Sequence, residues 1–468
     1  VARANEGHKV ILVRWETNPD DLAGMIAAEG ILTSHGGKTS HAAVIARGMG
    51  APCVCGVEQL KIDAEKKEAA LTGTDIVIHE GDMISLDGTT GIVVLGAVDL
   101  VMPELTGDLD TILEWADEYR RLGVRANADN PADAQLSRDF GAEGIGLDRT
   151  EHMFLGERKQ IIQTFILNED EEVRKEAVEQ LFEAQTGDFY GMFKAMDGLP
   201  VIVRLLDPPL HEFLESARAL DVEIARLEAT GGDPAVIEKK RALMEQIDSF
   251  SEANPMLGLR GCRLAIKYPI LAEMQVRAIA TAAAQLKKEG LDPKPEIMIP
   301  LVCEAEELKY VKKVVVETAD AEIAAAGVEL DYEVGTMIEI PRAALTADEI
   351  AKEADFFCFG TNDLTQMTYG FSRDDAGKFL NAYYDAKIFE NDPFAKLDQV
   401  GVGKLMETAI KLGKPVNPNL HIGICGEHGG DPSSVEFCHK IGLDYVSCSP
   451  FRVPIARLAA AQAAIANK

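Results

Sequence analysis

The amino-acid sequence predicts an α/β protein in two parts: a small N-terminal domain over residues 1–96 and a (β/α)8 TIM barrel over residues 122–468. Two observations predict the barrel. Short apolar segments alternate with helical stretches from residue 122 onward, which is typical of parallel strands joined by helices. There are eight such segments, the number that closes a TIM barrel. A third observation separates the parts, because residues 97–121 contain an acidic helical stretch that we interpret as a linker.

The N-terminal domain is predicted from short β-branched and aliphatic runs separated by turn residues such as Asp87-Gly88. A helix is expected over 19–28, where Asp20 and Asp21 fall in the first turn. A second helix is expected to begin at His41. The predicted strands are 10–14, 30–33, 53–55, 76–78, 83–86 and 91–95.

The barrel prediction depends on eight predicted strands. The third strand is followed by a long insertion over about 208–250. Within this insertion, residues 220–247 are predicted to form a charged helical hairpin with a turn at 231–234. The predicted barrel strands are 124–128, 144–147, 201–206, 296–302, 333–338, 356–359, 422–425 and 445–448.

Composition limits the classes of partner. The chain has 47 basic and 77 acidic residues and a net charge of −30, which argues against nucleic acid or an anionic membrane as a main partner. No apolar run is long enough to span a bilayer. The 8 cysteines have no zinc-ribbon spacing and favour a reducing, cytoplasmic location. The chain opens with Val1 rather than Met, so we expect its start to be a boundary within a longer sequence.

One segment of the N-terminal domain, residues 36–43, has the features of a phosphoryl-accepting histidine. Its glycines let the backbone approach an anion, and Thr39 and Ser40 can cap a helix and donate to phosphate oxygens. The helix N-terminus favours added negative charge on His41. Taken alone, the segment is more typical of a histidine that caps a surface helix, and only the downstream residues favour the phosphoryl acceptor.

Chemistry-bearing residues lie at or near the C-terminal ends of five predicted barrel strands, where TIM-barrel catalytic groups lie. Arg149 and Arg204 can hold phosphate or carboxylate by forked hydrogen bonds. Glu339 and Asp363 offer oxygen ligands suited to Mg²⁺. Cys425 can supply or remove a proton at carbon. Any one of these residues alone is as readily a salt-bridged rim residue, but together they predict one active site at the barrel mouth.

Longer motifs link these residues to a known family. The sequence resembles the PEP-utilising enzymes, and among them the pyruvate, phosphate dikinases, over nearly its whole length. The histidine motif is shared with PEP synthase and with enzyme I of the sugar phosphotransferase system, whereas the stretches 205–213, 371–378 and 427–430 are similar to the dikinases specifically. The resemblance rests on the segments 36–43, 146–154, 204–213, 335–342, 359–366 and 425–431.

The resemblance implies a role for each matching position. His41 is expected to be the phosphohistidine and Cys425 the proton donor to the enolate carbon. Arg149 and Arg204 are expected to bind the phosphoryl and enolate oxygens of PEP or pyruvate, and Arg260 either touches substrate or is structural. Glu339 and Asp363 are expected to bind Mg²⁺ and to contact the substrate. The substrate site is also expected to be lined by Gly360, Thr361 and Asn362.

The family reaction converts ATP, phosphate and pyruvate into AMP, pyrophosphate and PEP. The resemblance implies that the histidine domain swivels on the linker and that two copies associate through the barrel. It also implies an ATP-grasp domain ahead of the histidine domain. We expect none of that domain in this chain, since His41 lies near its start, and we expect a histidine domain shortened at its N-terminus. ATP and phosphate are therefore expected to act only through that absent domain.

The sequence departs from the family at Asp148, where a cysteine is usual. Strand alternation is expected to point this side chain away from the barrel mouth, with little effect on chemistry.

Two other functions remain open. A phosphocarrier similar to enzyme I would need a docking domain for a carrier protein, and the sequence suggests none. A non-catalytic regulatory or structural protein is disfavoured by the intact set of predicted site residues.

Overall fold

The computed structural model falls into two compact units, Val1–Asp110 and Thr111–Lys468. His41 lies outside the described residues. The structure describes residues 2–5, 7–17, 21, 24–25, 27–36, 42–43, 46, 51–64, 66–88, 90–99, 107–154 and 156–467.

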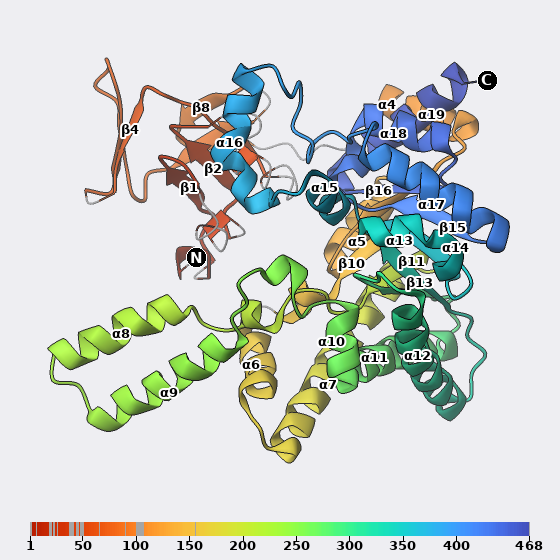
Figure 1. Ribbon diagram of the computed structural model, residues 1–468. Helices are drawn as coiled ribbons and strands as arrows, with labels where there is room; N and C mark the ends of the chain where they lie inside the picture. The colour runs from red at the N-terminus through yellow and green to blue at the C-terminus, as the bar shows by residue number, and fades with distance from the viewer. Residues whose placement is uncertain are drawn as a thin grey trace. The chain divides into compact units, whose positions relative to one another are not determined.

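Within its described residues, the first unit contains three small sheets (Figure 1). Strands β1, β2 and β3 are parallel, whereas β4–β5–β6 and the pair β7–β8 are antiparallel. Leu32, Val54 and Ile84 bring a buried residue from each of three strands into one core. The described elements are α1 (Ala2–Asn5), β1 (Ile11–Arg14), β2 (Gly30–Thr33), β3 (Cys53–Val54), β4 (Leu60–Asp63), β5 (Glu68–Leu71), β6 (Val77–His79), β7 (Ile84–Asp87) and β8 (Ile92–Leu95).

Strands β4 and β5 are absent from the sequence prediction. Their Lys, Glu and Ala residues favour helix over strand in isolation. The hairpin forms because Leu60 and Ala69 are buried against the core of the unit, and that burial outweighs local propensity. The predicted helix over 19–28 and the helix expected at His41 fall largely outside the described residues.

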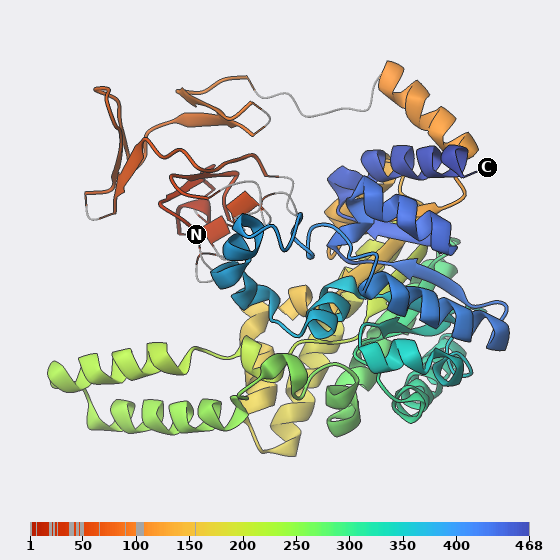
Figure 2. The ribbon, with the colours of Figure 1, turned by 45° about the horizontal axis from the view of Figure 1, so that its top comes forward.

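The second unit contains a closed barrel of eight parallel strands, in the order β9 to β16 around the ring. This confirms the predicted TIM barrel. Figure 2 shows the strands surrounded by helices. The strands are β9 (Gly123–Asn127), β10 (Ile145–Arg149), β11 (Pro200–Arg204), β12 (Lys294–Ile299), β13 (Glu333–Ile338), β14 (Phe356–Phe359), β15 (His421–Ile424) and β16 (Tyr445–Cys448).

Alternate residues of each strand point into the barrel, where they form a closed core. Gly423 illustrates how tightly this core is filled. A Cβ at Gly423 would lie 2.0 Å from Cζ of Tyr445, so the tyrosine ring occupies the space that a side chain there would need. Cys358 and Cys425 belong to the same buried cluster. The barrel is therefore packed between its two ends, and any substrate site has to lie at an end.

The helices form an outer layer, with α11 packed between α7 and α12. In the insertion after β11, α8 and α9 form the predicted hairpin, which projects from the barrel in both views (Figures 1 and 2). The α-helices are α5 (Pro131–Asp139), α6 (Lys159–Leu167), α7 (Glu171–Ala195), α8 (Ala217–Ala229), α9 (Pro234–Phe250), α10 (Cys262–Lys267), α11 (Pro269–Lys288), α12 (Ala305–Ala326), α13 (Pro341–Leu345), α14 (Ala347–Ile350), α15 (Thr361–Tyr369), α16 (Arg373–Asp385), α17 (Val402–Val416), α18 (Pro432–Ile441) and α19 (Val453–Ala466).

Within the predicted linker, residues 111–119 of α4 (Asp108–Tyr119) belong to the second unit. Leu113 and Ala116 are buried. Asp117 accepts hydrogen bonds from Arg457 of α19, at 3.1 Å from Nε and 2.5 Å from Nη2. Among the described residues, no helix has both the length and the apolar character needed to cross a membrane.

Candidate active site

The predicted site residues of the barrel lie at the carboxyl ends of its strands. Arg149 ends β10 and Arg204 ends β11, while Glu339, Gly360 and Cys425 directly follow β13, β14 and β15. Three more, Thr361, Asn362 and Asp363, lie in the first turn of α15 after β14. Parallel strands point the same way around the ring, so these residues share one end of the barrel.

Arg204 is held between two acidic side chains. Its Nη2 donates to Glu151 Oε1 in a very short contact, and its Nη1 lies 3.0 Å from Asp207 Oδ2. Burial by itself lowers the pKa of Arg204, but the charges of Asp207 and Glu151 outweigh it and raise that pKa. The guanidinium is therefore fixed in charge and orientation, and its buried Nε has no partner among the described residues.

Arg260 pairs with two carboxylates that follow different strands, Asp207 after β11 and Asp363 after β14. It donates to Asp207 at 2.6 Å through Nη2 and to Asp363 at 3.1 Å through Nη1. Asp207 thus bridges two arginines. Burial raises the pKa of Asp207, but Arg204 and Arg260 outweigh it, so the pKa lies below its ordinary value.

Glu339 is fully buried and is held by the backbone. The N–H of Leu301 donates to Glu339 Oε1 at 2.7 Å. Leu301 has φ 61°, a left-handed conformation that costs a non-glycine residue about 1–3 kcal/mol. Gly261 permits this turn, because a Cβ there would lie 2.6 Å from Cβ of Leu301. The strained turn thus directs the N–H of Leu301 toward the carboxylate of Glu339, which follows β13.

Glu339 and Asp363 fit a divalent cation by the chemistry of their donors. Burial is the largest cause that raises the pKa of Glu339, and the negative charge of Asp363 is the next. Two carboxylates that repel each other in a buried site favour a hard cation such as Mg²⁺, which removes that repulsion. Gly360 leaves the space open, since a Cβ there would lie 2.7 Å from Glu339 Oε2.

Cys425 is buried beside both strand-end arginines. A hydrogen bond with the Cys358 thiol lowers the pKa of Cys425, burial opposes this, and the positive charges of Arg149 and Arg204 add to the lowering. The two thiols meet diagonally across β14 and β15, whose paired positions include Gly423 opposite Cys358. A thiol that can lose a proton next to two guanidinium groups suits acid–base chemistry at carbon.

Thr361, one of the predicted substrate-lining residues, forms a hydrogen bond with His428. The distance from His428 Nδ1 to Thr361 Oγ1 is 2.7 Å, and that from Nε2 to the Pro393 carbonyl is 2.8 Å. Burial lowers the pKa of His428. The neutral ring therefore donates from Nε2 and accepts the hydroxyl of Thr361 at Nδ1. Asn362 has a buried Oδ1 with no partner among the described residues.

Four residues of this arrangement were not predicted as site residues: Glu151, Asp207, His428 and Asp129. Asp129 accepts from the backbone N–H of Arg149 at 2.8 Å and lies 3.6 Å from its Nη1. Each of the four holds a predicted residue in place. Sequence position could have identified two of them, because Glu151 and Asp207 lie two and three residues after strand-end arginines.

Asp148 is fully buried, and neither of its carboxylate oxygens has a hydrogen-bond partner among the described residues. Burial, with the negative charges of Asp129, Glu151 and Asp188, raises the pKa of Asp148 well above its ordinary value. Asp188 belongs to α7, in the outer helical layer. The folded protein therefore keeps the Asp148 proton to a higher pH than the unfolded chain does.

Replacing Asp148 by Asn should make the barrel more stable than the wild type at neutral pH. As pH rises above about 4, the unfolded wild type loses the Asp148 proton while the folded protein keeps it. The free energy of unfolding of the wild type therefore falls relative to the variant, by up to about 1.4 kcal/mol per pH unit. Urea unfolding between pH 4 and 8 measures this difference, and Asp148→Leu should show the same trend. Parallel pH profiles for wild type and both variants would contradict a raised pKa at Asp148.

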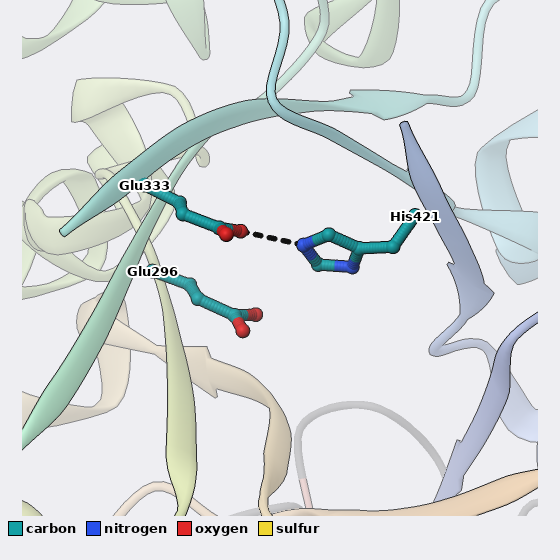
Figure 3. A group of neighbouring side chains, drawn as sticks. All are labelled: Glu296, Glu333 and His421. Carbon is teal, nitrogen blue, oxygen red and sulfur yellow. Dashed lines mark hydrogen bonds and ion pairs between the residues drawn. The ribbon is translucent and has the colours of Figure 1, made fainter. Parts of the chain in front are cut away.

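The opposite end of the barrel carries a second polar group, at the starts of β12, β13 and β15. Figure 3 shows Glu296 and Glu333 extending toward His421, with 2.6 Å between Glu333 Oε2 and His421 Nε2. Their ligand atoms lie within 4.8 Å of one another, beside an open pocket of about 380 Å³. Arg125 pairs with both oxygens of Glu296, at 2.6 and 3.2 Å. We therefore interpret this group as an ion-pair network that closes the amino end of the barrel.

Comparison with known proteins agrees with this geometry. Residues 103–465 match the family described as PEP-utilising enzyme, PEP-binding domain, and residues 7–91 match its mobile domain. The chain is 56% identical to pyruvate, phosphate dikinase of Clostridium symbiosum, covering 100% of this chain and 52% of that protein. It is 54% identical to the Rhizobium meliloti (strain 1021) enzyme, with 99% and 51% covered. The Arabidopsis thaliana chloroplastic enzyme is also 54% identical, with 99% and 47% covered.

The chain thus spans about half the length of these relatives. The family match to residues 103–465 alone covers well over half of the chain, and it coincides with the barrel that carries the clustered arginines, carboxylates and thiol. This chain belongs to the PEP-utilising enzymes.

Proposed function

We propose that this chain carries out the PEP half of the pyruvate, phosphate dikinase reaction, moving a phosphoryl group between PEP and His41. The observation that carries the proposal is the cluster at one barrel end of two arginines, two carboxylates and a thiol. Three relatives that are 54–56% identical over essentially the whole chain bear that enzyme's name. In the complete reaction, ATP, phosphate and pyruvate become AMP, PEP and pyrophosphate.

Each clustered residue has a part in the proposed reaction. Arg149 and Arg204 bind the phosphoryl and enolate oxygens of PEP or pyruvate by charge-assisted hydrogen bonds. Glu339 and Asp363 would hold Mg²⁺, on which members of this family generally depend, and the ion would neutralise negative charge on the enolate and phosphoryl oxygens. Asn362 offers its amide to the substrate, and Gly360 leaves room beside Glu339. Arg260 positions Asp363 through its ion pair.

The proton step belongs to Cys425. When the P–O bond of PEP breaks and the phosphoryl group passes to His41, the remaining enolate takes a proton at carbon from the Cys425 thiol, which gives pyruvate. The resulting thiolate lies near the positive charges of Arg149 and Arg204. In the reverse direction the same thiolate removes a methyl proton from pyruvate.

The domain roles are part of the proposal. Residues 1–96 would act as the swivelling domain that presents His41, residues 97–121 as its linker, and residues 122–468 as the PEP-binding barrel. We also propose a cytoplasmic location, supported by cysteines that are all thiols, and a homodimer formed through the barrel. Phosphorylation of His41 from ATP and phosphate would need a further domain.

The test is the intact mass of the purified chain after incubation with PEP and Mg²⁺, with pyruvate assayed in parallel. We expect one phosphoryl group per chain and an equal amount of pyruvate. His41→Ala, and separately removal of Mg²⁺ by a chelator, should abolish both products. Labelling of the histidine by ATP and phosphate alone would overturn the proposed division of the reaction. Transfer of the label to a carrier protein instead would favour a phosphocarrier.

A further inference from the structure

Two thiols of the first unit lie unusually close together. Cys53 belongs to β3 and Cys55 follows it by two residues, so their side chains extend from the same face of the strand. Their sulfur atoms are 3.1 Å apart. Both residues are partly exposed, whereas Cys262, Cys358 and Cys425 of the barrel are buried. A small reagent therefore has access to this pair.

The geometry suits an intramolecular disulfide. Bringing the sulfurs to bonding distance, about 2.05 Å, requires a movement of about 1 Å. Residues two apart in an extended strand have Cα atoms within about 6.6 Å, inside the range that disulfides span. The short ring is expected to carry strain, and strained, partly exposed disulfides are the ones that small thiols reduce readily.

The pair packs against the segment that follows the predicted phosphohistidine. Cys53 and Cys55 contact the buried cluster that contains Ala42 and Ala46. Ala42 directly follows His41 in the sequence. Gly56 adds a second contact, because a Cβ there would lie 2.5 Å from the carbonyl oxygen of Gly36, where the histidine motif begins. A change at the two sulfurs therefore has a short physical route to this segment.

We propose that Cys53 and Cys55 form a redox-sensitive dithiol that a low-molecular-weight disulfide oxidises reversibly, and that oxidation slows phosphoryl transfer at His41. One thiolate attacks the reagent's S–S bond and releases one reagent thiol. The second thiolate then attacks the mixed disulfide, which forms the Cys53–Cys55 bond and releases the second reagent thiol. The protein loses two protons and two electrons, and the reagent gains them. Repacking around Ala42 and Ala46 links the bond to His41. This link rests on the proposed function, whereas the disulfide itself does not.

The experiment equilibrates the full chain with defined ratios of oxidised and reduced glutathione, followed by acid quenching, alkylation and mass spectrometry. We expect a loss of two hydrogen atoms that maps to the peptide containing Cys53 and Cys55. We also expect the rate of PEP-dependent phosphorylation to fall severalfold and to recover with dithiothreitol. Cys53→Ser and Cys55→Ser should keep the reduced-state rate and resist oxidation. Cys303→Ser, which removes a partly exposed thiol of the barrel, should respond as the wild type does.

The outcomes distinguish formation of the disulfide from its effect on phosphoryl transfer at His41. Thiols that stay reduced, or stop at the mixed disulfide, would overturn the dithiol site. A disulfide that forms without any change in the phosphorylation rate would overturn its link to His41. Reduced protein that PEP does not label would mean that the proposed function fails, while the mass measurement would still decide whether the disulfide forms.

Discussion

Replacing Asp207 by Asn is expected to lower the free energy of unfolding of the barrel by about 3–5 kcal/mol. Asp207 is buried and pairs with two arginines, at 3.0 Å from Arg204 Nη1 and 2.6 Å from Arg260 Nη2. Removing its charge leaves two adjacent guanidinium groups in a buried site. Each has one remaining carboxylate partner, Glu151 or Asp363, but the negative charge that lay between the two arginines is gone and their mutual repulsion increases.

Urea unfolding followed by circular dichroism measures this loss. Asp375→Asn is the matched control, because it removes an exposed ion pair with Lys378 and such pairs contribute about 0–1 kcal/mol. The double variant Asp207→Asn with Arg260→Met should recover part of the loss, since one of the two buried positive charges is gone. If Asp207→Asn unfolds at the same urea concentration as the wild type, the two arginines do not depend on Asp207.

The second large effect concerns Cys425. Replacement by Ala is expected to slow exchange of the pyruvate methyl protons with solvent by about 10²–10⁴-fold, the usual contribution of a positioned acid–base group. The physical reason is that Cys425 is the thiol whose pKa is lowered beside Arg149 and Arg204, so it can both hold and release a proton there. Deuterium incorporation into pyruvate in the presence of Mg²⁺, followed by NMR, measures the exchange rate.

Cys438→Ala is the control for this experiment, because it makes the same chemical change at another buried thiol, on α18. Its exchange rate should match the wild type. Cys425→Ala should still bind PEP, since the arginines and carboxylates of the site are unchanged. An undiminished exchange rate in Cys425→Ala would assign the proton step to another group.

Much of the fold was predictable from the sequence because its determinants are local or periodic. All eight barrel strands were predicted within three residues of their observed bounds, since buried parallel strands are short apolar runs between helical stretches. The hairpin of α8 and α9 was predicted from its charge pattern and its Gly-Gly-Asp-Pro turn. Strands β4 and β5 were missed because their pairing and the burial of Leu60 override the preferences of their own residues.

The candidate site, like the fold, was predictable from the sequence only in part. By itself the sequence determined the closed barrel and its family, and it predicted which residues follow the ends of the strands, because strand ends are readable from apolar periodicity. The tertiary structure alone decided that Asp207 bridges Arg204 and Arg260, that a strained Leu301 donates to Glu339, and that Cys358 contacts Cys425. These contacts join residues on different strands and loops. Their energies depend on distance and burial, which a linear pattern of residue types does not encode.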